Sequence, residues 1–375
     1  MKKLTKSEFV GDLSKLVSIE TLTSDIEQNT KALDYIESKI DKRTNIKRIK
    51  NGKAECLIAC NIDTRTPDIC YLAHIDVVAG RSDQFNMIVK GSIAYGRGVS
   101  DMKFSIPIGY TLLNNLIDSK SKLSFAFVVT TDEETGGYDG CAYLVNEYGF
   151  KPKVLIVPDG GDNLIFVNKS KGVCALRIDS IGKPVHSSRI WDGKNALEPL
   201  IKLCGEILRR YEKNNKKESW KTMINIGKLQ GGTFVNQVCP EAYVTLDFRF
   251  PETTTSDAII DEVSAIAKKI DSSLKISKSS VGKPTFVDMK NLIVKLFIES
   301  LEKTFDQKIK IKGTYGASDA RHFADLNIPI LMIKPIGGEI HGENENIDID
   351  SCLLFYSALN NFLIEFEEKK LQLHR

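Results

Sequence analysis

"LSFAFVVTTDEETGG", residues 123–137, is the stretch that decides the fold of this chain. It begins as an apolar, partly β-branched run, which is typical of a buried strand. The run ends in three consecutive acidic residues and two glycines. Like charges side by side repel each other, and the end of a strand has no structural need for Asp132, Glu133 and Glu134 together. We therefore expect carboxylates at this point to serve a chemical purpose.

Other short apolar runs have the same character as residues 123–130. They are "ICYLA" (69–73), "KVLIVP" (153–158) and "IPILMI" (328–333), and helical patterns such as 104–117 and 140–149 separate most of them. Strands that alternate with helices predict an α/β fold, with a mostly parallel sheet that helices cover on both faces. In such a sheet, the loops at the carboxyl ends of the strands carry the chemistry.

The middle of the chain has a different pattern. "VCALRIDSI", "TMINIGKLQGG" and "AYVTLDFRF" alternate like half-exposed antiparallel strands, and helices are expected around 195–213 and 256–269. The sequence thus predicts a smaller α+β domain inserted into the α/β domain. The predicted boundaries are 1–172 and 283–375 for the two parts of the α/β domain, and 173–282 for the insertion.

Composition narrows the class of protein. At 375 residues the chain is longer than a usual single core, so two domains are expected. A net charge of +3 is nearly balanced, which argues against nucleic-acid binding. The N-terminus has no continuous apolar run and no stretch approaches a membrane span, so we expect neither a signal peptide nor membrane binding. The eight cysteines form no C-x-x-C pair, which favours a reduced, cytoplasmic protein.

A histidine and two aspartates lie on the segments that follow the predicted strand at 69–73. His74 and Asp76 stand in "YLAHIDVVAG", where both face the same side if the strand continues. Such a pair suits a metal ligand and its supporting carboxylate, although an exposed H-x-D is common. Asp101 follows the glycine-rich turn in "YGRGVSDMK". Because this reads G-x-G-x-x-D, a turn that presents a carboxylate, or a simple structural turn, explains it better than a dinucleotide loop.

Glu133 and Glu134 are not expected to be equivalent. Repulsion between neighbouring carboxylates raises the pKa of one of them unless a cation lies nearby. A divalent metal would supply that cation, so that one glutamate binds the metal and the other takes a proton from metal-bound water. An exposed acidic loop is the alternative explanation.

Two more residues stand in predicted strand-end loops. Asp159 lies in "KVLIVPDGGD" and His341 in "IGGEIHGENENI". Together with three residues named above they form a set of two histidines and three carboxylates: His74, Asp101, Glu134, Asp159 and His341. With one carboxylate shared, this is the ligand set expected of two neighbouring metals such as Zn²⁺. Each motif is weak alone, and their joint occurrence carries the prediction.

The ordered motifs "HID", "GRGVSDMK", "TDEETGG", "PDGGD" and "IHGENE" resemble those of one enzyme family. It is the acetylornithine deacetylase, succinyl-diaminopimelate desuccinylase, aminoacylase and glutamate carboxypeptidase family of dinuclear zinc hydrolases. The resemblance covers nearly the whole chain, including "GKPVHSS" (182–188), "GGTFVNQVCP" (231–240), "DFRF" (247–250) and "GASDAR" (316–321). It implies a zinc-exopeptidase-like catalytic domain with an inserted lid or dimerisation domain.

The resemblance implies a role for each candidate ligand. Asp101 would bridge two zinc ions, for which Co²⁺ or Mn²⁺ could substitute. His74 and Asp159 would complete one metal site, and Glu134 and His341 the other.

It also implies roles for neighbours of these ligands. Glu133 matches the general base of the family, and Asp76 matches the carboxylate that orients His74. The peptide bond between Asp101 and Met102 is expected to be cis.

One residue matches a substrate contact of the family, and three more are candidates. His186 resembles a histidine of the smaller domain that, in dimeric members, reaches the active site of the partner and steadies an oxyanion, and Asn236 is a second polar contact. Arg249 or Arg321 would hold a substrate carboxylate by a bidentate pair. Arg249 is equally well explained as an exposed strand residue, and Arg321 as a helix cap.

The implied reaction is hydrolysis of an amide bond. Water bridging the zinc ions would lose a proton to Glu133, and the resulting hydroxide would attack the carbonyl. The substrate expected first is an N-acyl amino acid of the acetylornithine or succinyl-diaminopimelate type, since overall spacing and "GASDAR" resemble the deacylases. Asp159 instead favours a dipeptidase or exopeptidase. A metal-free binding protein would need a broken ligand set. A homodimer through the inserted domain is expected.

Overall fold

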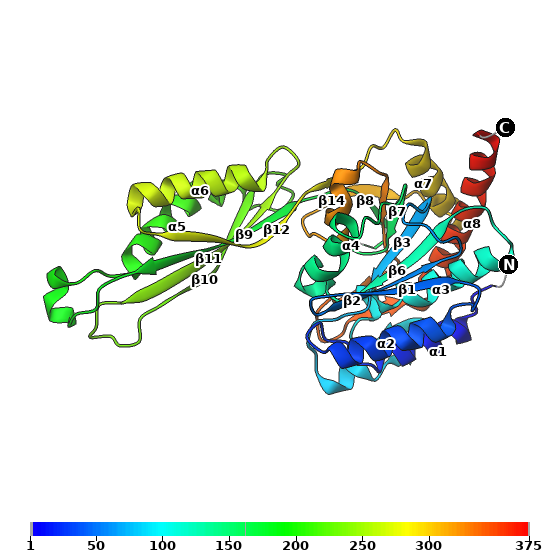
Figure 1. The fold of residues 1–375 in the computed structure, drawn as a ribbon, viewed down its shortest axis with the longest axis horizontal. Coiled ribbons are helices and arrows are strands. Elements are labelled where there is room, and N and C mark those ends of the chain that lie inside the picture. The colour runs from blue at the N-terminus through cyan, green and yellow to red at the C-terminus, as the bar shows by residue number, and fades with distance from the viewer. Residues whose placement is uncertain (1–2, 162, 374–375) are drawn as a thin grey trace. The chain divides into compact units, whose positions relative to one another are not determined.

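The computed structural model describes residues 3–161 and 163–373, and it forms two compact units. Unit 1 consists of Met1–Lys169 and Phe286–Arg375, and unit 2 is Ser170–Thr285. In Figure 1 the ribbon of unit 2 runs from green to yellow, between the two parts of unit 1 in chain order.

Unit 1 is built on a six-stranded sheet in the order β1-β2-β6-β3-β7-β15. The bounds of these strands are β1 Asn45–Asn51, β2 Ala54–Cys60, β3 Ile69–His74, β6 Phe125–Thr130, β7 Leu155–Val157 and β15 Ile330–Met332. Strands β6, β3, β7 and β15 pair in parallel, whereas β1 and β2 pair antiparallel. The predicted α/β class with a mostly parallel sheet is confirmed. The four parallel strands are fully buried, which explains why they read as uninterrupted apolar runs.

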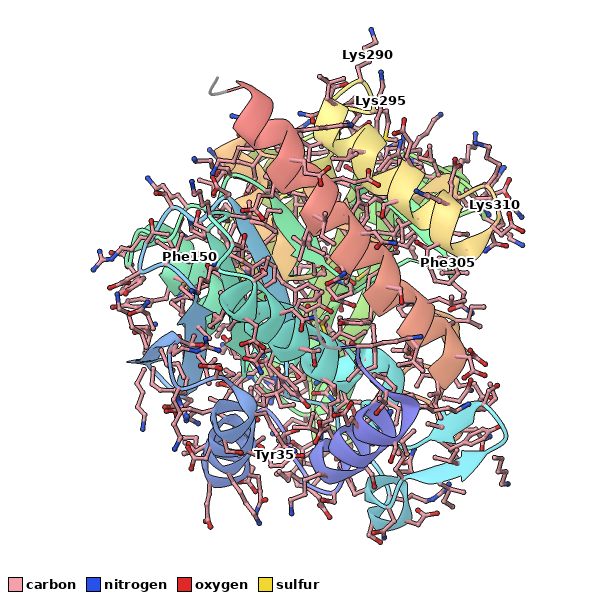
Figure 2. The ribbon with its side chains drawn as sticks, turned by 90° about the vertical axis from the view of Figure 1, so that its right-hand side faces the viewer. Tyr35, Phe150, Lys290, Lys295, Phe305 and Lys310 are labelled. Atoms are coloured by element: carbon pink, nitrogen blue, oxygen red, sulfur yellow. The ribbon has the colours of Figure 1, made fainter. Side chains whose placement is uncertain are left out.

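Helices cover this sheet. Those of unit 1 are α1 Lys6–Val17, α2 Ile26–Lys39, α3 Ser105–Asp118, α4 Tyr143–Asn146, α7 Leu292–Phe305 and α8 Ile349–Leu373. Helix α1 begins with a capping box between Thr5 and Glu8. Helix α7 lies along α8 in Figure 2. The rings of Phe297 on α7 and Phe362 on α8 meet edge to face, with their centroids 5.1 Å apart. The apolar faces of the helices thereby close the core of unit 1.

The helix predicted over 140–149 is wrong in extent. Only α4 is regular, and the residues before it form a wide turn. The backbone N–H groups of Asp139 and Gly140 donate to the Asp132 carboxylate at 3.0 and 2.9 Å, which caps the start of this turn. A side chain outside the helical pattern therefore caps the turn that precedes α4.

Two small sheets complete unit 1. One has the order β13-β8-β14, with bounds Thr285–Phe286, Ile165–Ser170 and Lys310–Thr314. The other has the order β16-β17-β5-β4, with bounds Gly337–Gly338, Asn346–Asp348, Ile93–Tyr95 and Ile88–Lys90. Because β17 pairs with β5, the segment that follows His341 lies beside the segment that precedes Asp101.

Unit 2 has a core of its own. Its antiparallel sheet has the order β10-β11-β9-β12, with bounds Met223–Gly231, Glu241–Phe250, Gly172–Ile181 and Lys275–Gly282. Helices α5 Leu197–Tyr211 and α6 Ser256–Ile270 pack on it. Buried and half-exposed residues alternate along β11, as expected of a sheet covered on one face.

Candidate active site

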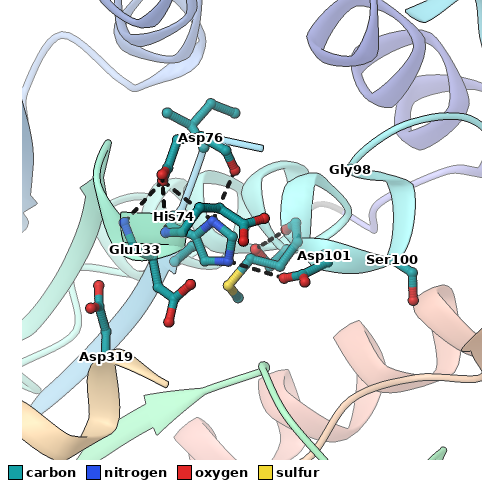
Figure 3. A network of polar contacts seen from close by, with 12 residues as sticks. His74, Asp76, Gly98, Ser100, Asp101, Glu133 and Asp319 are labelled. Atoms are coloured by element: carbon teal, nitrogen blue, oxygen red, sulfur yellow. Dashed lines mark hydrogen bonds and ion pairs between the residues drawn. The ribbon is translucent and has the colours of Figure 1, made fainter. Parts of the chain in front are cut away.

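The carboxyl ends of three parallel strands bring the predicted residues together. Strand β3 ends at His74, which lies opposite Thr130 at the end of β6. Asp159 lies two residues beyond the end of β7. In open α/β sheets, ligands bind at this edge. Figure 3 shows the polar network that forms there in unit 1.

His74 is buried and has a different partner at each ring nitrogen. Its Nδ1 lies 3.0 Å from the backbone carbonyl of Asp76 and 3.5 Å from the carboxylate of the same residue. A carbonyl only accepts hydrogen bonds, so Nδ1 carries a proton and Nε2 faces Asp101 Oδ1, 3.1 Å away. Burial alone would lower the pKa of His74, but its hydrogen bonds with Asp101 and Asp76 raise that pKa well above its ordinary value. The carboxylates around His74 therefore stabilise a positive charge, either a proton on Nε2 or a cation bound between Nε2 and Asp101.

The Asp76 carboxylate joins two loops of the site. It is fully buried and accepts the backbone N–H groups of Glu133 and Glu134 at 3.2 and 3.1 Å. The hydroxyl of Thr23 donates to it at 2.7 Å. In Figure 3, Asp76 lies between the His74 ring and the backbone of Glu133. Asp76 thus fixes the acidic turn as well as the histidine.

Asp101 contacts a histidine with each carboxylate oxygen. Oδ1 faces His74, and Oδ2 lies 3.2 Å from Nε2 of His341. The turn before it passes through Gly98 at φ +81°, and the peptide bond between Asp101 and Met102 is cis, as the resemblance implied. Burial would raise the pKa of Asp101, but hydrogen bonds with His341 and His74 hold it below its usual range. Asp101 is therefore a carboxylate placed between two histidines.

His341 completes the second half of the site. Its Nε2 lies 3.2 Å from the Glu134 carboxylate as well as from Asp101. Hydrogen bonds with Asp101 and Glu134 raise the pKa of His341 to about 10. The backbone of His341 has φ +63°, a left-handed conformation that is uncommon for a residue with a Cβ and that clusters at functional sites.

The five residues form two groups that share one carboxylate. In each group the ligand atoms all lie within 4.8 Å of one another. The groups are His74, Asp101 and Asp159, and Asp101, Glu134 and His341. Imidazole nitrogens and carboxylate oxygens in this number suit Zn²⁺ and related divalent ions. The donor set therefore fits a pair of metals that the same aspartate bridges.

Glu133 lies beside both groups and belongs to neither. Burial raises its pKa well above the ordinary value; the charge of His74 opposes this shift, and those of Asp159 and Asp319 add to it. Burial and the charge of Asp101 likewise raise the pKa of Asp159 to about 6. The carboxylates are thus crowded in a buried place, which a bound cation would relieve.

The remaining acid of the turn and its glycines shape the backbone. Asp132 is buried and caps the wide turn before α4, as described above, so it faces the interior rather than solvent. Gly136 and Gly137 have φ of +113° and +65°. A Cβ at Gly137 would lie 2.0 Å from Asp319 Oδ1, so the chain can turn there only with glycine.

The "GASDAR" segment (316–321) and the next residue, His322, support this turn. The sequence predicts no role there for Asp319 or His322. Arg321 is buried, and its Nη2 donates to the carbonyl of Gly136 at 2.6 Å. His322 Nε2 lies 3.0 Å from the same carbonyl. Asp319 accepts the hydroxyl of Thr130 at 3.1 Å. Arg321 therefore lies close to the acidic turn, and part of its guanidinium is engaged by protein.

The other predicted contacts belong to unit 2. His186 and Asn236 are both exposed. Their loops are adjacent, since the N–H of Ser187 donates to the Asn236 carbonyl at 2.9 Å. Nδ1 of His186 lies 2.8 Å from the hydroxyl oxygen of Ser188. Arg249 is half-buried on β11 and pairs with Asp247 at 3.2 Å.

Residues 70–365 match the model of one protein family, described as peptidase family M20/M25/M40. The chain belongs to this family. The family match covers most of the catalytic unit and all of unit 2. The chain is therefore a hydrolase of amide or peptide bonds, and the recognition made from its motifs is confirmed. Among the described residues, no helix is both long and apolar enough to cross a membrane.

Individual relatives are distant but similar over most of their length. A succinyl-diaminopimelate desuccinylase of Alkalilimnicola ehrlichii is 25% identical over 313 residues, which cover 78% of this chain and 83% of that protein. The structure of an M20 family metallo-carboxypeptidase from Sulfolobus solfataricus has a TM-score of 0.80 at 18% identity and covers 95% of this chain and 98% of that one. A tripeptidase from Staphylococcus aureus has a TM-score of 0.77 at 19% identity, with coverages of 98% and 100%.

Proposed function

We propose that this protein is a zinc-dependent amide hydrolase that removes the acyl group from an N-acyl amino acid. The observation that carries the proposal is the pair of ligand groups that share Asp101, with the Glu133 carboxylate beside them. The distant desuccinylase relatives support an acetylated or succinylated amino acid as substrate.

The protein residues divide the work as follows. When bound, zinc would lower the pKa of water and polarise the substrate carbonyl. His74, Asp159, Glu134, His341 and the bridging Asp101 would hold the metals. Glu133 takes the proton of the attacking water and returns it to the leaving amine. Burial raises the pKa of Glu133, so this carboxylate holds a proton more readily than a solvated glutamate does, which suits a group that takes up a proton and passes it on.

A dipeptidase or exopeptidase is the second candidate. Asp159 supports it, because the family resemblance associates an aspartate at this position with peptidases that act on a free amino end. A panel of N-acetyl amino acids, N-succinyl amino acids and simple dipeptides, assayed with zinc, tests the proposal. Faster cleavage of the acylated compounds is expected, and cleavage of the dipeptides alone would overturn the deacylase assignment.

Contacts to substrate are proposed for residues of both units. His186 and Asn236 would face the developing oxyanion. Their side chains are exposed on adjacent loops and could contact a substrate, which supports this role. Arg249 or Arg321 would pair with a substrate carboxylate. Arg321 is supported by its place beside the acidic turn.

A homodimer through unit 2 is also proposed. Large apolar side chains are exposed on its surface, among them Ile190, Trp191, Phe234 and Val235. Patches of this kind mark interaction sites. Sedimentation at several concentrations tests the proposal. We further propose a reducing, cytoplasmic setting, which the eight buried free thiols support.

A further inference from the structure

Glu345 lies four residues beyond His341, at the end of the "IHGENE" motif, and the sequence predicts no role for it. Its carboxylate is almost completely buried, at 1% exposed, and accepts four hydrogen bonds. Oε1 accepts the backbone N–H groups of Ser100 and Asp101 at 3.0 and 3.2 Å. Oε2 accepts the N–H of Gly98 at 3.0 Å and Nη1 of Arg97 at 2.7 Å.

These four bonds fill the acceptor positions of a carboxylate, which has two oxygens with about two lone pairs each. Glu345 therefore has no oxygen left for a metal ion. Three of the four donors, the N–H groups of Gly98, Ser100 and Asp101, belong to the turn that presents Asp101, and Figure 3 labels these three residues.

Arg97 extends the same contact to the loop of His341. It is 3% exposed, and its Nη2 lies 3.3 Å from the carbonyls of His341 and Gly342. Gln84 donates to the carbonyls of Gly342 and Glu343 at 3.0 and 3.1 Å. These donors hold the loop where His341 has its left-handed backbone.

We propose that Glu345 and Arg97 are positioning residues that lock the loops of Asp101 and His341 at one spacing. The proposal rests on the proposed function, because the spacing matters if both side chains bind metal. The two loops are far apart in sequence, and the contact of 3.2 Å between Asp101 and His341 joins them. Asp101 belongs to both ligand groups, whereas His341 belongs to one. Outer contacts of this kind typically change metal affinity 10–100-fold when removed.

Glu345→Gln tests the proposal with little change in shape. In either orientation, the amide NH₂ group meets two donors that now lack an acceptor. We expect the dissociation constant for Co²⁺ to rise about 10–100-fold and the visible absorption of bound Co²⁺ to change. In the metal-free protein, amide hydrogen exchange of residues 97–103 is expected to speed up by about tenfold or more, since the variant removes an acceptor of these N–H groups.

Asp68→Asn is the matched control. Asp68 is also a buried carboxylate of unit 1, and it accepts the N–H and hydroxyl of Ser124 and the amines of Lys153 and Lys370. It precedes β3, at the opposite edge of the sheet from the site. This variant should leave the Co²⁺ spectrum and affinity unchanged.

Arg97→Lys is the second variant and carries the test if Glu345→Gln does not fold. Lysine keeps the charge but cannot span the carboxylate and the two carbonyls. Its Co²⁺ dissociation constant should also rise about tenfold or more. Unchanged affinity, spectrum and exchange in a folded variant would overturn the proposal. Failure of the proposed function would appear differently, as wild-type protein that binds no Co²⁺, while the exchange measurement would still report on the loops.

Discussion

The candidate site residues of unit 1 and those of unit 2 differ in burial and in the number of polar contacts that their side chains make with the rest of the chain. In unit 1, His74 and Asp101 are buried or nearly so and bind one another. In unit 2, His186 and Asn236 are exposed, and the ring of His186 forms a hydrogen bond with Ser188, two residues along the same loop. The fold therefore holds the proposed metal ligands in place by contacts within unit 1, whereas the proposed substrate contacts of unit 2 are exposed.

This difference predicts how substitutions in the two units will act. A substitution among the buried site residues of unit 1 should abolish turnover or metal binding. A change on the exposed loops should reduce the rate and leave the metal bound. The predictions below test this contrast, from the largest expected effect to the smallest.

Glu133→Gln should have the largest effect on the rate. Removing a general base typically costs about 10²–10⁴-fold in turnover, and the amide cannot take a proton. The metal content should remain that of the wild type, because Glu133 belongs to neither ligand group. Assay of kcat beside metal analysis checks this. Asp139→Asn, on an exposed acid a few residues along the chain, should retain full turnover. A metal-replete Glu133→Gln with normal turnover would refute the assignment.

His341→Ala should lower both metal content and turnover. The loss in kcat/KM should exceed about a hundredfold, because even changes outside the ligand shell cost 10–100-fold. Metal analysis after dialysis measures the loss, with Glu343→Ala as the control. Glu343 lies in the same loop and is largely exposed, pairing with Arg81. If His341→Ala kept its metals, the second ligand group would be wrong.

His186→Ala should reduce kcat by about 10²–10³-fold, the usual effect of losing one oxyanion donor. Its metal affinity should stay unchanged, since the ligand groups lie wholly in unit 1. Arg189→Ala, on the same exposed loop, serves as the control. A fall in metal content would contradict the division between the units.

Asp68→Asn should affect stability rather than rate. Burial would raise the pKa of Asp68, but hydrogen bonds from Lys370, Ser124 and Lys153 hold it below the ordinary value of 3.8. A carboxyl whose pKa is lowered by folding stabilises the protein above its unfolded pKa and loses that effect as the pH falls. The variant should therefore unfold about 1–3 kcal/mol more easily at neutral pH, with the difference shrinking below about pH 4. Urea unfolding across pH measures this, and an equal difference at all pH values would contradict it.

The sequence predicts the candidate metal ligands better than the residues that hold their loops in place. His74 and Asp159 end or follow buried apolar strands, and such strands end at one edge of a parallel sheet. Glu345 and Arg97 could not be found in this way. Their contacts join loops more than two hundred residues apart in the chain, and they depend on the pairing of β17 with β5.

The extent of α4 was missed for a similar reason. The apolar pattern at 140–149 is helical, yet Asp132 captures two N–H groups of the residues before it. Periodicity describes which face is buried, and it does not show where the wide turn gives way to the regular helix.

The central claim is that Asp101 serves two metal sites at once. Metal analysis of wild-type protein and Asp101→Ala, each dialysed against zinc and then against buffer, tests it most directly. We predict two zinc ions per wild-type chain and the loss of both in the variant, because every ligand group contains Asp101. A variant that keeps two ions, or a wild-type chain that holds none, would contradict the account.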